Sequence, residues 1–540
     1  MQEHDLHAIA FPKLDDELIA SLGRCTHSKL ERYARGATLF EEGDREFRFF
    51  VVRTGEVEIV DRSGDEPKVV TVHRAGQFTG DITHLTGTPA IVSAVARTDC
   101  EVFAISSEAL RHVLDQCTDF ADIVLQAFLA RRQLLREPGS VTGVRVIGSR
   151  YSRDTFRIRE FLTKSRLPFT WLDLESEPAV GELLRRFGVT EADTPVVAWG
   201  KRVLLRNPSN QELADAFGVR RRPEKIVYDL AIVGGGPAGL AAAVYGSSEG
   251  LATVVLERTA AGGQAGASMR IENYLGFPSG LTGADLADRA VLQANRFGAR
   301  LSIPTGVTRL AFDGAYAVLH IDGDETVVAR CLLVATGADY RRLPVDGCDR
   351  LEGCGVYYAA TPIEAAACSG SDVVVVGAGN SAGQAVVFLA RRSRKVILVV
   401  RGDDLEANMS SYLARRIQDT ENVEVSLRTE VRRMIGDKQL TAVELVDRDG
   451  EARTVETPAV FSFIGAVPRT DWLPEEIERD EKGFVLTGPS LAQASPRWPL
   501  RRAPFLLETT RPGVFAAGDV RAGSVKRVAS AVGEGSMAVQ

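Results

Sequence analysis

The sequence predicts a multidomain α/β chain: an N-terminal β-roll with helices, a small α/β unit, and two further α/β lobes. Three observations point to this fold class. At about 150 residues per domain, 540 residues correspond to three or four domains. Two basic, turn-rich segments, 131–140 and 220–223, divide the chain into parts of different composition. In the last part, a short apolar strand twice runs directly into a glycine-rich turn and a helix.

The overall composition is that of an ordinary globular protein, with 45% hydrophobic and 25% charged residues, which excludes a mostly disordered chain. The net charge of -7 is mild for this length, so we expect neither a nucleic-acid nor a membrane partner. The acidic N-terminus does not resemble a signal peptide, and no apolar run approaches the roughly 20 residues of a membrane helix. We therefore expect a cytoplasmic protein.

Cysteine is scarce, with seven residues, at Cys25, Cys100, Cys117, Cys331, Cys348, Cys354 and Cys368. None of them has C-x-x-C spacing. A disulfide scaffold and a multi-cysteine metal site are therefore not expected.

Residues 1–138 are expected to form the β-roll. Apolar or alternating runs separated by turns predict its strands, at Phe49–Val51, Glu56–Val60, Val69–Val72 and Ile91–Ala96. Residues 107–135 then read as helix. The unit resembles the cyclic-nucleotide-binding domain of cyclic AMP receptor proteins, through EEGD at 41–44, FFVVRTGEVEIV at 49–60 and GQFTGDITHLTGTP at 76–89.

The ligand site of this unit departs from the family. Gly80-Asp81 can replace the family's glycine–glutamate pair, but the position of its phosphate-binding arginine holds Ala90. A cyclic phosphate without a charge-assisted partner loses a major source of affinity. We expect a roll retained for packing or dimerisation; the alternatives are a cyclic-nucleotide sensor and a site for another small ligand.

Residues 139–223 are expected to alternate strands and helices. The strands are predicted at Val144–Ile147, Thr170–Leu174, Pro195–Trp199 and Arg202–Leu205, with a hairpin turn at Gly200-Lys201. Helices are predicted through Phe156–Leu162, Val180–Phe187 and Glu212–Ala216. The order resembles a thioredoxin or glutaredoxin fold, with Pro195 at the cis-proline position. The turn 148–155, where that family carries its redox cysteines, holds none, so we expect an adaptor or docking unit without thiol exchange.

The first glycine turn follows the strand Tyr228–Val233. The pattern is G-x-G-x-x-G: Gly234 permits the tight turn, Gly236 lets the backbone approach a pyrophosphate, and Gly239 lets helix and strand pack closely. The next strand, Ala252–Leu256, ends at Glu257, whose carboxylate is placed to accept from ribose hydroxyls. Together these features predict a dinucleotide site, which also includes Pro237 and Ala238.

A second copy follows the strand Asp372–Val376. It contains Gly377, Gly379, Asn380 and Ser381, and its next strand, Lys395–Val400, ends at Arg401 rather than at an acid. An arginine at this position favours the 2′-phosphate of NADPH over NADH. Three acids close behind it, Asp403, Asp404 and Glu406, oppose a phosphate, so NADH remains the alternative, and so does a merely solvated Arg401.

Residues 225–540 resemble a low-molecular-weight thioredoxin reductase. Beyond the two glycine turns, the matching segments are Gly262-Gly263-Gln264, Ile271–Tyr274, Leu333–Gly337 and Gly513–Asp519. The resemblance implies FAD at the first turn and NAD(P)H at the second. It implies that 344–464 form an NAD(P)H domain inserted between two parts of the FAD domain, 224–343 and 465–540. Further FAD-site residues it implies are Gly263, Gln264, Asn273, Thr336, Gly337, Gly518 and Asp519.

The family's C-A-T-C segment is absent. By alignment, its two cysteine positions hold Ala359 and Pro362, neither of which can act as a nucleophile. Cys354 and Cys368 lie outside that segment, 14 residues apart, and read as buried apolar residues. A disulfide between them, which would require an unusual loop, is the alternative.

The last residues resemble the family's helix over the flavin ring. Lys526 and Arg527 precede it and could face a reduced flavin in a homodimer, although a surface role fits equally well. The sequence stops at Gln540, inside this helix, so we expect either a natural chain that is short here or a missing tail.

The predicted function is that of an FAD-dependent NAD(P)H oxidoreductase that passes electrons directly from flavin to an external acceptor. The candidate acceptors are a ferredoxin or flavodoxin, a quinone, oxygen or a disulfide, with a small redox protein favoured. A nucleotide- or redox-sensing scaffold and an atypical thioredoxin-disulfide reductase are the alternatives. No catalytic acid or base can be named from the sequence.

Overall fold

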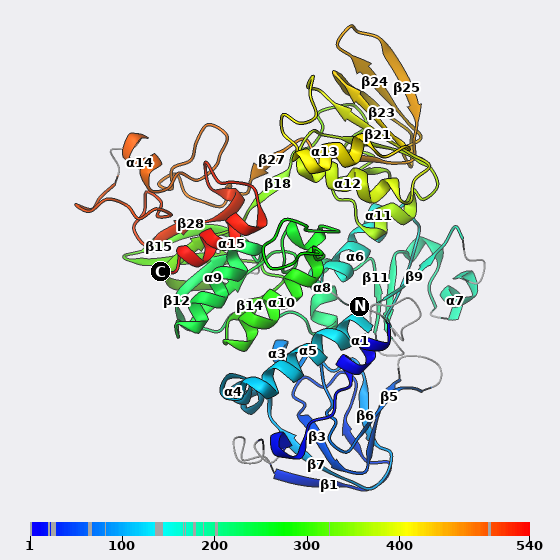
Figure 1. Cartoon of the computed structure of the whole chain (residues 1–540), viewed down its shortest axis with the longest axis vertical. Coiled ribbons are helices and arrows are strands. Elements are labelled where there is room, and N and C mark those ends of the chain that lie inside the picture. Colours follow the sequence, from blue (N-terminus) through cyan, green and yellow to red (C-terminus); the bar gives the residue numbers. More distant parts are fainter. Residues whose placement is uncertain are drawn as a thin grey trace.

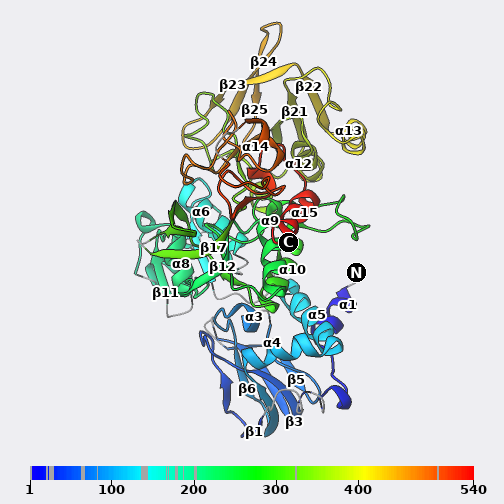
Figure 2. The same ribbon diagram turned by 90° about the vertical axis from the view of Figure 1, so that its left-hand side faces the viewer.

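The computed structural model describes residues 3–19, 22, 29–62, 67–81, 83–134, 144–165, 167, 169–176, 180–186, 188–199, 203–322, 325–494 and 498–540. Figures 1 and 2 place the N-terminal roll at one end of the long axis and the lobe containing β20–β25 at the other. The small α/β unit and the remaining lobe lie between them. The hairpin turn expected at Gly200-Lys201, Arg202, Cys25 and the boundary at 138/139 lie outside the described residues.

The N-terminal unit is a β-roll, as predicted. Its strands form two sheets, of order β1-β7-β3 and β2-β6-β4-β5. The strand bounds are β1 Lys29–Tyr33, β2 Thr38–Phe40, β3 Phe49–Thr54, β4 Glu56–Asp61, β5 Lys68–Arg74, β6 Ser93–Ala96 and β7 Cys100–Ile105. The helices are α1 Glu3–Ala10, α3 Thr83–Thr86, α4 Ser107–Gln116 and α5 Thr118–Leu134.

The single helical stretch expected at 107–135 is wrong in one respect, because the chain breaks it into α4 and α5. Cys117 leaves helical geometry, with φ −116° and ψ 89°, and α5 restarts at Thr118. The core formed by these helices includes Leu292, which belongs to the neighbouring lobe. The roll is therefore packed against that lobe.

The second unit has a four-stranded sheet of order β11-β10-β8-β9. β9 runs parallel to β8, whereas β10 is antiparallel to both β8 and β11. The bounds are β8 Val144–Gly148, α6 Arg153–Lys164, β9 Thr170–Asp173, α7 Val180–Arg186, β10 Val196–Trp199, β11 Val203–Arg206 and α8 Asn210–Ala216. The Thr194–Pro195 peptide bond is cis, as predicted.

The first lobe of the C-terminal part is built on a seven-stranded sheet of order β14-β13-β12-β17-β16-β15, with β28 beside β17. Its strands are β12 Val227–Val233, β13 Thr253–Leu256, β14 Arg300–Ser302, β15 Val307–Asp313, β16 Tyr316–Ile321, β17 Thr326–Val334 and β28 Val514–Ala516. The parallel strands β12, β13 and β17 end at one edge of this sheet. Its helices are α9 Pro237–Ser248, α10 Gly283–Arg296, α14 Pro489–Ala494 and α15 Val528–Met537.

The second lobe combines a parallel sheet of order β19-β26-β20-β21-β22 with an antiparallel sheet, β23-β24-β25. The parallel strands are β19 Val356–Tyr357, β20 Asp372–Val376, β21 Lys395–Val400, β22 Val423–Leu427 and β26 Val460–Ser462. The others are β23 Thr429–Ile435, β24 Ala442–Asp447 and β25 Ala452–Glu456, and the helices are α11 Pro362–Ala367, α12 Asn380–Ala390 and α13 Ser411–Gln418.

Two short strands join the lobes, β18 Ala338–Tyr340 and β27 Ala466–Pro468, which pair antiparallel. They lie close to the predicted boundaries at 343/344 and 464/465, which stay predictions. No helix in the described parts of the chain is long and apolar enough to span a membrane.

Candidate functional site

The first glycine turn has the backbone geometry that a pyrophosphate site requires. Gly234 has φ +113°, and a Cβ there would overlap the carbonyl group of Ala335. A Cβ on Gly239 would overlap the carbonyl oxygen of Gly234, so α9 can pack this closely only with glycine. At Gly236, by contrast, the nearest atom to such a Cβ is the Gly263 Cα, at 4.0 Å. The turn is therefore crowded at Gly234 and Gly239 but open at Gly236, where a ligand could approach the backbone closely.

The N-terminus of α9 is available for an anion. Its N-cap is Gly236, which provides no side-chain cap, and Pro237 follows, so the next N–H groups belong to Ala238 and Gly239. Uncapped N–H groups and the positive end of the helix dipole favour a phosphate at this point.

Glu257 lies at the end of β13, directly beside this turn. Its Oε2 accepts the N–H of Gly235 at 2.7 Å, and its Oε1 accepts the N–H of Thr259 at 2.7 Å. The loop that contains Gly263 closes the other side, where the N–H of Gly262 donates to the Gly235 carbonyl at 2.7 Å. The structure therefore brings Glu257, Gly263 and the glycine turn together.

Gly518 and Asp519 reach the same region from the far end of the sequence. A Cβ on Gly518 would lie 3.1 Å from the Ala238 Cβ, so the two segments touch. Asp519 is largely buried, and burial raises the pKa of its carboxyl group, while the nearby Lys526 opposes this shift. Lys526 itself is exposed, with its Nζ 4.6 Å from the Phe484 ring centroid, and Arg527 is exposed beside it.

Sequence reasoning missed the pair that holds Gly518. Glu534, on α15, accepts the N–H of Gly518 at 2.7 Å and the Nε–H of Arg521 at 3.2 Å. Its side chain is 13% exposed and that of Arg521 is 18% exposed. The feature of the sequence that could have indicated this pair is Glu534 itself, the one charged residue in the apolar and small-residue stretch Val528–Met537.

The second glycine turn repeats the first. Gly377 has φ +140°, and a Cβ there would lie 2.5 Å from the Phe463 carbonyl oxygen, whereas nothing lies within 4 Å of a Cβ on Gly379. Gly379 is the N-cap of α12 and provides no side-chain cap. Asn380 accepts the N–H of Ser410 at 2.7 Å, so its side chain ties the start of α12 to the start of α13.

Arg401 lies on the surface at the end of β21. Its side chain is 86% exposed, and its Nε is 3.7 Å from Glu430 Oε1. Of the three acids close behind Arg401, Asp403 is paired with Arg428 at 2.6 Å and with Arg448 at 3.5 Å. These two arginines, which the sequence reading did not include, offset part of the negative charge near Arg401.

A cavity of about 250 Å³ separates the two lobes. Gln264 and Ser381 line it from opposite lobes, and so do Ala359 and Ala360 from the segment aligned with C-A-T-C. An ion pair between Glu272 and Arg416, 3.1 Å long, crosses from one lobe to the other. Of the predicted cofactor residues, Gln264 and Ser381 line this interlobe cavity, whereas the glycines of both turns do not, and Asn273 is exposed.

Thr336 and Gly337 lie where β17 leads into the lobe connection. The Thr336 hydroxyl donates to the Arg469 carbonyl at 2.8 Å, and the Gln264 amide donates to the Ala338 carbonyl. These contacts fix the connecting strands next to the interlobe cavity.

No disulfide joins the described cysteines, and Cys354 and Cys368 are both free and buried. The Cys354 thiol donates to the Tyr151 carbonyl at 3.2 Å, and the Cys368 thiol donates to the Glu364 carbonyl at 3.3 Å. Burial raises the pKa of both thiols, to about 12 for Cys368. The interpretation of these two residues as inert, buried cysteines is therefore favoured over a disulfide.

The small α/β unit packs against residues 352–357, which precede Ala359. The ring of Phe156, on α6, contacts that of Tyr357 in a tilted arrangement, with centroids 5.7 Å apart, and packs on the core of the second lobe. Arg153 pairs with Glu352 at 3.4 Å. The turn where a thioredoxin fold carries its cysteines thus lies against the second lobe, as Figure 1 shows for α6 and α11.

The roll has a cavity of its own, of about 110 Å³, lined by Ala90, Phe11 and the Gly80-Asp81 pair. The one arginine in its lining is Arg131 of α5, which donates to the carbonyls of Ala10 at 2.7 Å and Phe78 at 3.0 Å, and also to that of Gly80. The guanidinium of Arg131 therefore already donates to three backbone carbonyls. The described cavity provides no arginine at the position expected for a cyclic phosphate.

The family model described as "Pyridine nucleotide-disulphide oxidoreductase" matches residues 228–535, more than half of the chain. The chain belongs to this family. A second model, for the cyclic nucleotide-binding domain, matches residues 30–117. This pyridine nucleotide-disulphide oxidoreductase is thus an NAD(P)H-dependent flavin oxidoreductase of the thioredoxin-reductase type with a cyclic-nucleotide-binding-like domain in front, as the sequence predicted.

Curated relatives agree. The oxidoreductase is 35% identical to a thioredoxin reductase of Listeria innocua over 319 residues, which are 59% of this chain and 93% of the relative. It is 34% identical to the thioredoxin reductase of Bacillus subtilis over the same length, covering 94% of that relative. A solved T. acidophilum thioredoxin reductase matches with a TM-score of 0.52 and 28% identity, covering 58% of this chain and 97% of that one.

Proposed function

We propose that the first lobe holds FAD, that the second holds NADPH, and that electrons leave the flavin directly for an external acceptor. The observation that carries this proposal is Ala359 in the wall of the interlobe cavity, where the resemblance predicts a redox cysteine. The buried, unpaired Cys354 and Cys368 offer no substitute.

The residues we assign to the cofactors follow from the two turns and the segments that meet them. For FAD they are Gly234, Gly236, Pro237, Ala238, Gly239, Glu257, Gly263, Gln264, Asn273, Thr336, Gly337, Gly518, Asp519, Lys526 and Arg527. For the nicotinamide dinucleotide they are Gly377, Gly379, Asn380, Ser381 and Arg401. When bound, the two cofactors supply the redox chemistry, a hydride passing from nicotinamide to flavin.

The protein's own contribution is placement and electrostatics. The N–H groups at the starts of α9 and α12 would bind the two pyrophosphates, and the open Gly236 and Gly379 admit them. The Glu257 carboxylate, which now accepts the N–H of Gly235, would accept hydrogen bonds from the hydroxyls of the adenosine ribose instead. The lobe-crossing pair Glu272–Arg416, whose residues both line the interlobe cavity, would help to hold the two lobes at this separation.

We propose that Arg401 selects NADPH, since its side chain is exposed and, within the described chain, makes only a long, 3.7 Å ion pair with Glu430. Arg428 and Arg448 offset the charge of the nearby Asp403. Arg401→Ala is expected to raise the KM for NADPH about tenfold and to leave that for NADH within about twofold, because only NADPH carries the extra charge. Steady-state kinetics with both dinucleotides measure this. Arg432→Ala removes another exposed arginine of the same lobe, paired with Glu444, and serves as the control. Equal loss with NADPH and NADH would contradict the assignment.

We propose a small redox protein, such as a ferredoxin or flavodoxin, as the acceptor, and a homodimer as the assembly. Thioredoxin-disulfide reductase is the second candidate, and it is favoured by the names of the curated relatives. Anaerobic stopped-flow mixing with NADPH, followed by ferredoxin, flavodoxin, quinone and thioredoxin, tests the function. The proposal expects flavin bleaching and oxidation by a non-thiol acceptor. Turnover with thioredoxin alone would overturn it.

A further inference from the structure

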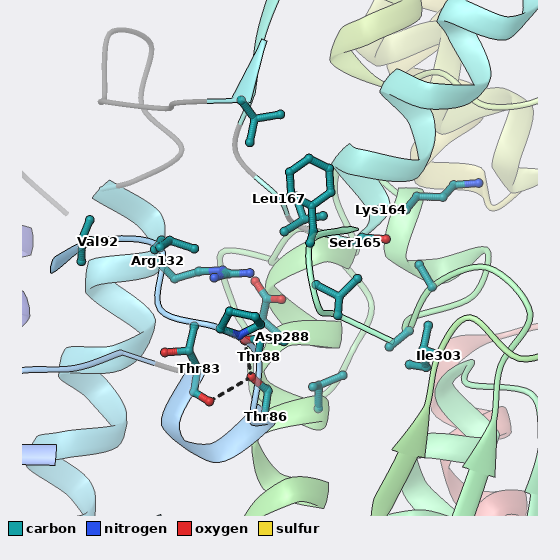
Figure 3. Close-up of a pocket in the computed structure, with 18 of the residues that line it drawn as sticks. Thr83, Thr86, Thr88, Val92, Arg132, Lys164, Ser165, Leu167, Asp288 and Ile303 are labelled. Carbon is teal, nitrogen blue, oxygen red and sulfur yellow. Dashed lines mark hydrogen bonds between the residues drawn. The ribbon is translucent and has the colours of Figure 1, made fainter. Parts of the chain in front are cut away.

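A cavity of about 390 Å³ lies at the junction of the roll, the second unit and the FAD lobe. It falls within the range of small-molecule sites, roughly 300–1,000 Å³. No step of the proposed function uses it. Figure 3 shows residues of all three units in its wall: Thr86, Thr88 and Arg132 from the roll, Lys164 and Leu167 from the second unit, and Asp288 and Ile303 from the FAD lobe.

Much of the wall is apolar. Val291 and Leu301 of the FAD lobe, Trp199 and Leu167 of the second unit and Val92 of the roll supply aliphatic and aromatic surface. The wall also carries four cations, Lys68, Arg132, Lys164 and Arg221, and two carboxylates, Asp61 and Asp288. Two of the cations face acids outside the wall, Lys164 at 2.7 Å from Glu160 and Arg132 at 3.9 Å from Asp81. An apolar space with a guanidinium in its wall suits a ligand that has an apolar body and an anionic group.

Arg221 is the residue in this wall best placed to bind an anion. It lies between the second unit and the FAD lobe, and its guanidinium packs on Gly87 of the roll, where a Cβ would overlap it. Its one hydrogen bond through the guanidinium is a long one, 3.4 Å, to Asn295. It forms no ion pair with any carboxylate in the described chain. Burial lowers its pKa to about 10, and Arg300 and Arg111 add to that shift.

Hydroxyl groups flank the position of this guanidinium. Thr86 and Thr88, on either side of Gly87, both line the cavity, and their Oγ1 atoms are 3.0 Å apart. A half-buried guanidinium beside two hydroxyls that hydrogen-bond each other provides donors for a carboxylate, sulfonate or phosphate group.

The cavity also reaches the flavin side of the enzyme. Ala260 and Ala261 line it and directly precede Gly262, whose N–H donates to the carbonyl of Gly235 in the first glycine turn. A ligand in the cavity would therefore contact the segment that closes the FAD site.

From this arrangement we infer that the junction cavity is an effector site for a small organic anion with an apolar body. A ligand bound there would alter the flavin site through the segment 260–263, and this effect is called the readout. The readout rests on the proposed FAD site, whereas the binding itself does not. The roll's smaller cavity adjoins this one, since both are lined by Phe11, Val70, Thr83, Ile91, Val92 and Leu134, but Arg221 lines only the junction cavity.

Calorimetric titration of the full-length, flavin-loaded protein with anilinonaphthalene sulfonate tests the binding, with uncharged phenylnaphthylamine as the matched probe. We expect saturable binding of the sulfonate. Arg221→Gln is expected to weaken it about tenfold or more and to leave the neutral probe within about twofold. Arg222→Gln, which removes the next arginine, exposed and paired with Glu325, is expected to leave both unchanged.

Val291→Trp fills the cavity and is expected to abolish binding of both probes, whereas Val291→Ala retains it. Sulfonate binding that is absent, or that survives both Arg221→Gln and Val291→Trp, overturns the site. The rate of flavin reduction by NADPH is then measured with and without saturating sulfonate: a change in the wild type but not in Val291→Trp supports the readout. Sulfonate binding without a change in the rate of flavin reduction overturns the readout but not the site. If NADPH reduces the flavin in none of the samples, the proposed function is refuted instead.

Discussion

Replacing Gly239 by alanine is expected to yield protein that retains less than about a tenth of the wild-type flavin. The added Cβ would overlap the carbonyl oxygen of Gly234, so either α9 moves away from β12 or the glycine turn opens. Neither neighbour is a flexible side chain, and overpacking of this kind costs about 1–3 kcal/mol or more. The ratio of flavin to protein absorbance after purification measures the result.

Gly533→Ala is the matched control for this variant. Gly533 lies in α15, within the same lobe, and nothing lies within 4 Å of a Cβ placed on it. It should retain full flavin and gain slightly in stability, because alanine favours helix over glycine. Full flavin occupancy in Gly239→Ala would show that the close approach of helix and turn is not required.

Removing the Glu534 carboxylate is expected to lower flavin affinity by a factor of about 10 to 100 and to cost about 3 kcal/mol of stability. Glu534→Ala leaves Arg521 without its partner and leaves the N–H of Gly518 without its acceptor, in a region that is largely buried. Gly518 directly precedes Asp519, so the effect should reach the proposed FAD site through the backbone.

The conservative variant separates positioning from simple destabilisation. Glu534→Gln keeps an oxygen that can accept from Gly518, so it should recover most of the flavin affinity while remaining less stable than the wild type. Fluorescence titration of the apoprotein with FAD and thermal unfolding give the two readouts. If Glu534→Gln loses as much flavin affinity as Glu534→Ala, the hydrogen bond to Gly518 is not what positions Asp519.

The sequence predicted the two glycine turns well because their geometry is local. Gly234 and Gly377 need positive φ, and the strands before them and the helices after them leave a clear pattern. The acid after one strand and the arginine after the other were found for the same reason.

What the sequence did not predict depends on contacts between distant segments. The Glu534 carboxylate reads as solvated until α15 is seen to pack on α9, and Arg428 and Arg448 lie far from Asp403 in sequence. The docking of Phe156 on Tyr357 joins two units whose sequence patterns say nothing about each other. The junction cavity, made by three units, could not be inferred from any one of them.

From this docking we expect a structural role for the second unit, which fits its missing cysteines. The Tyr151 carbonyl accepts from the Cys354 thiol, and Arg153 pairs with Glu352, so the turn 148–155 of this unit is a contact surface. We expect the unit to hold the second lobe, rather than to carry electrons.

We propose that the flavin alone stores electrons in this protein, and an anaerobic reductive titration measures how many electrons it takes up. With dithionite, the oxidised protein should be fully reduced by about two electrons per FAD, since Ala359 and the buried cysteines store none. A requirement for about four electrons per FAD, with long-wavelength absorbance from a thiolate beside the flavin, would contradict the account.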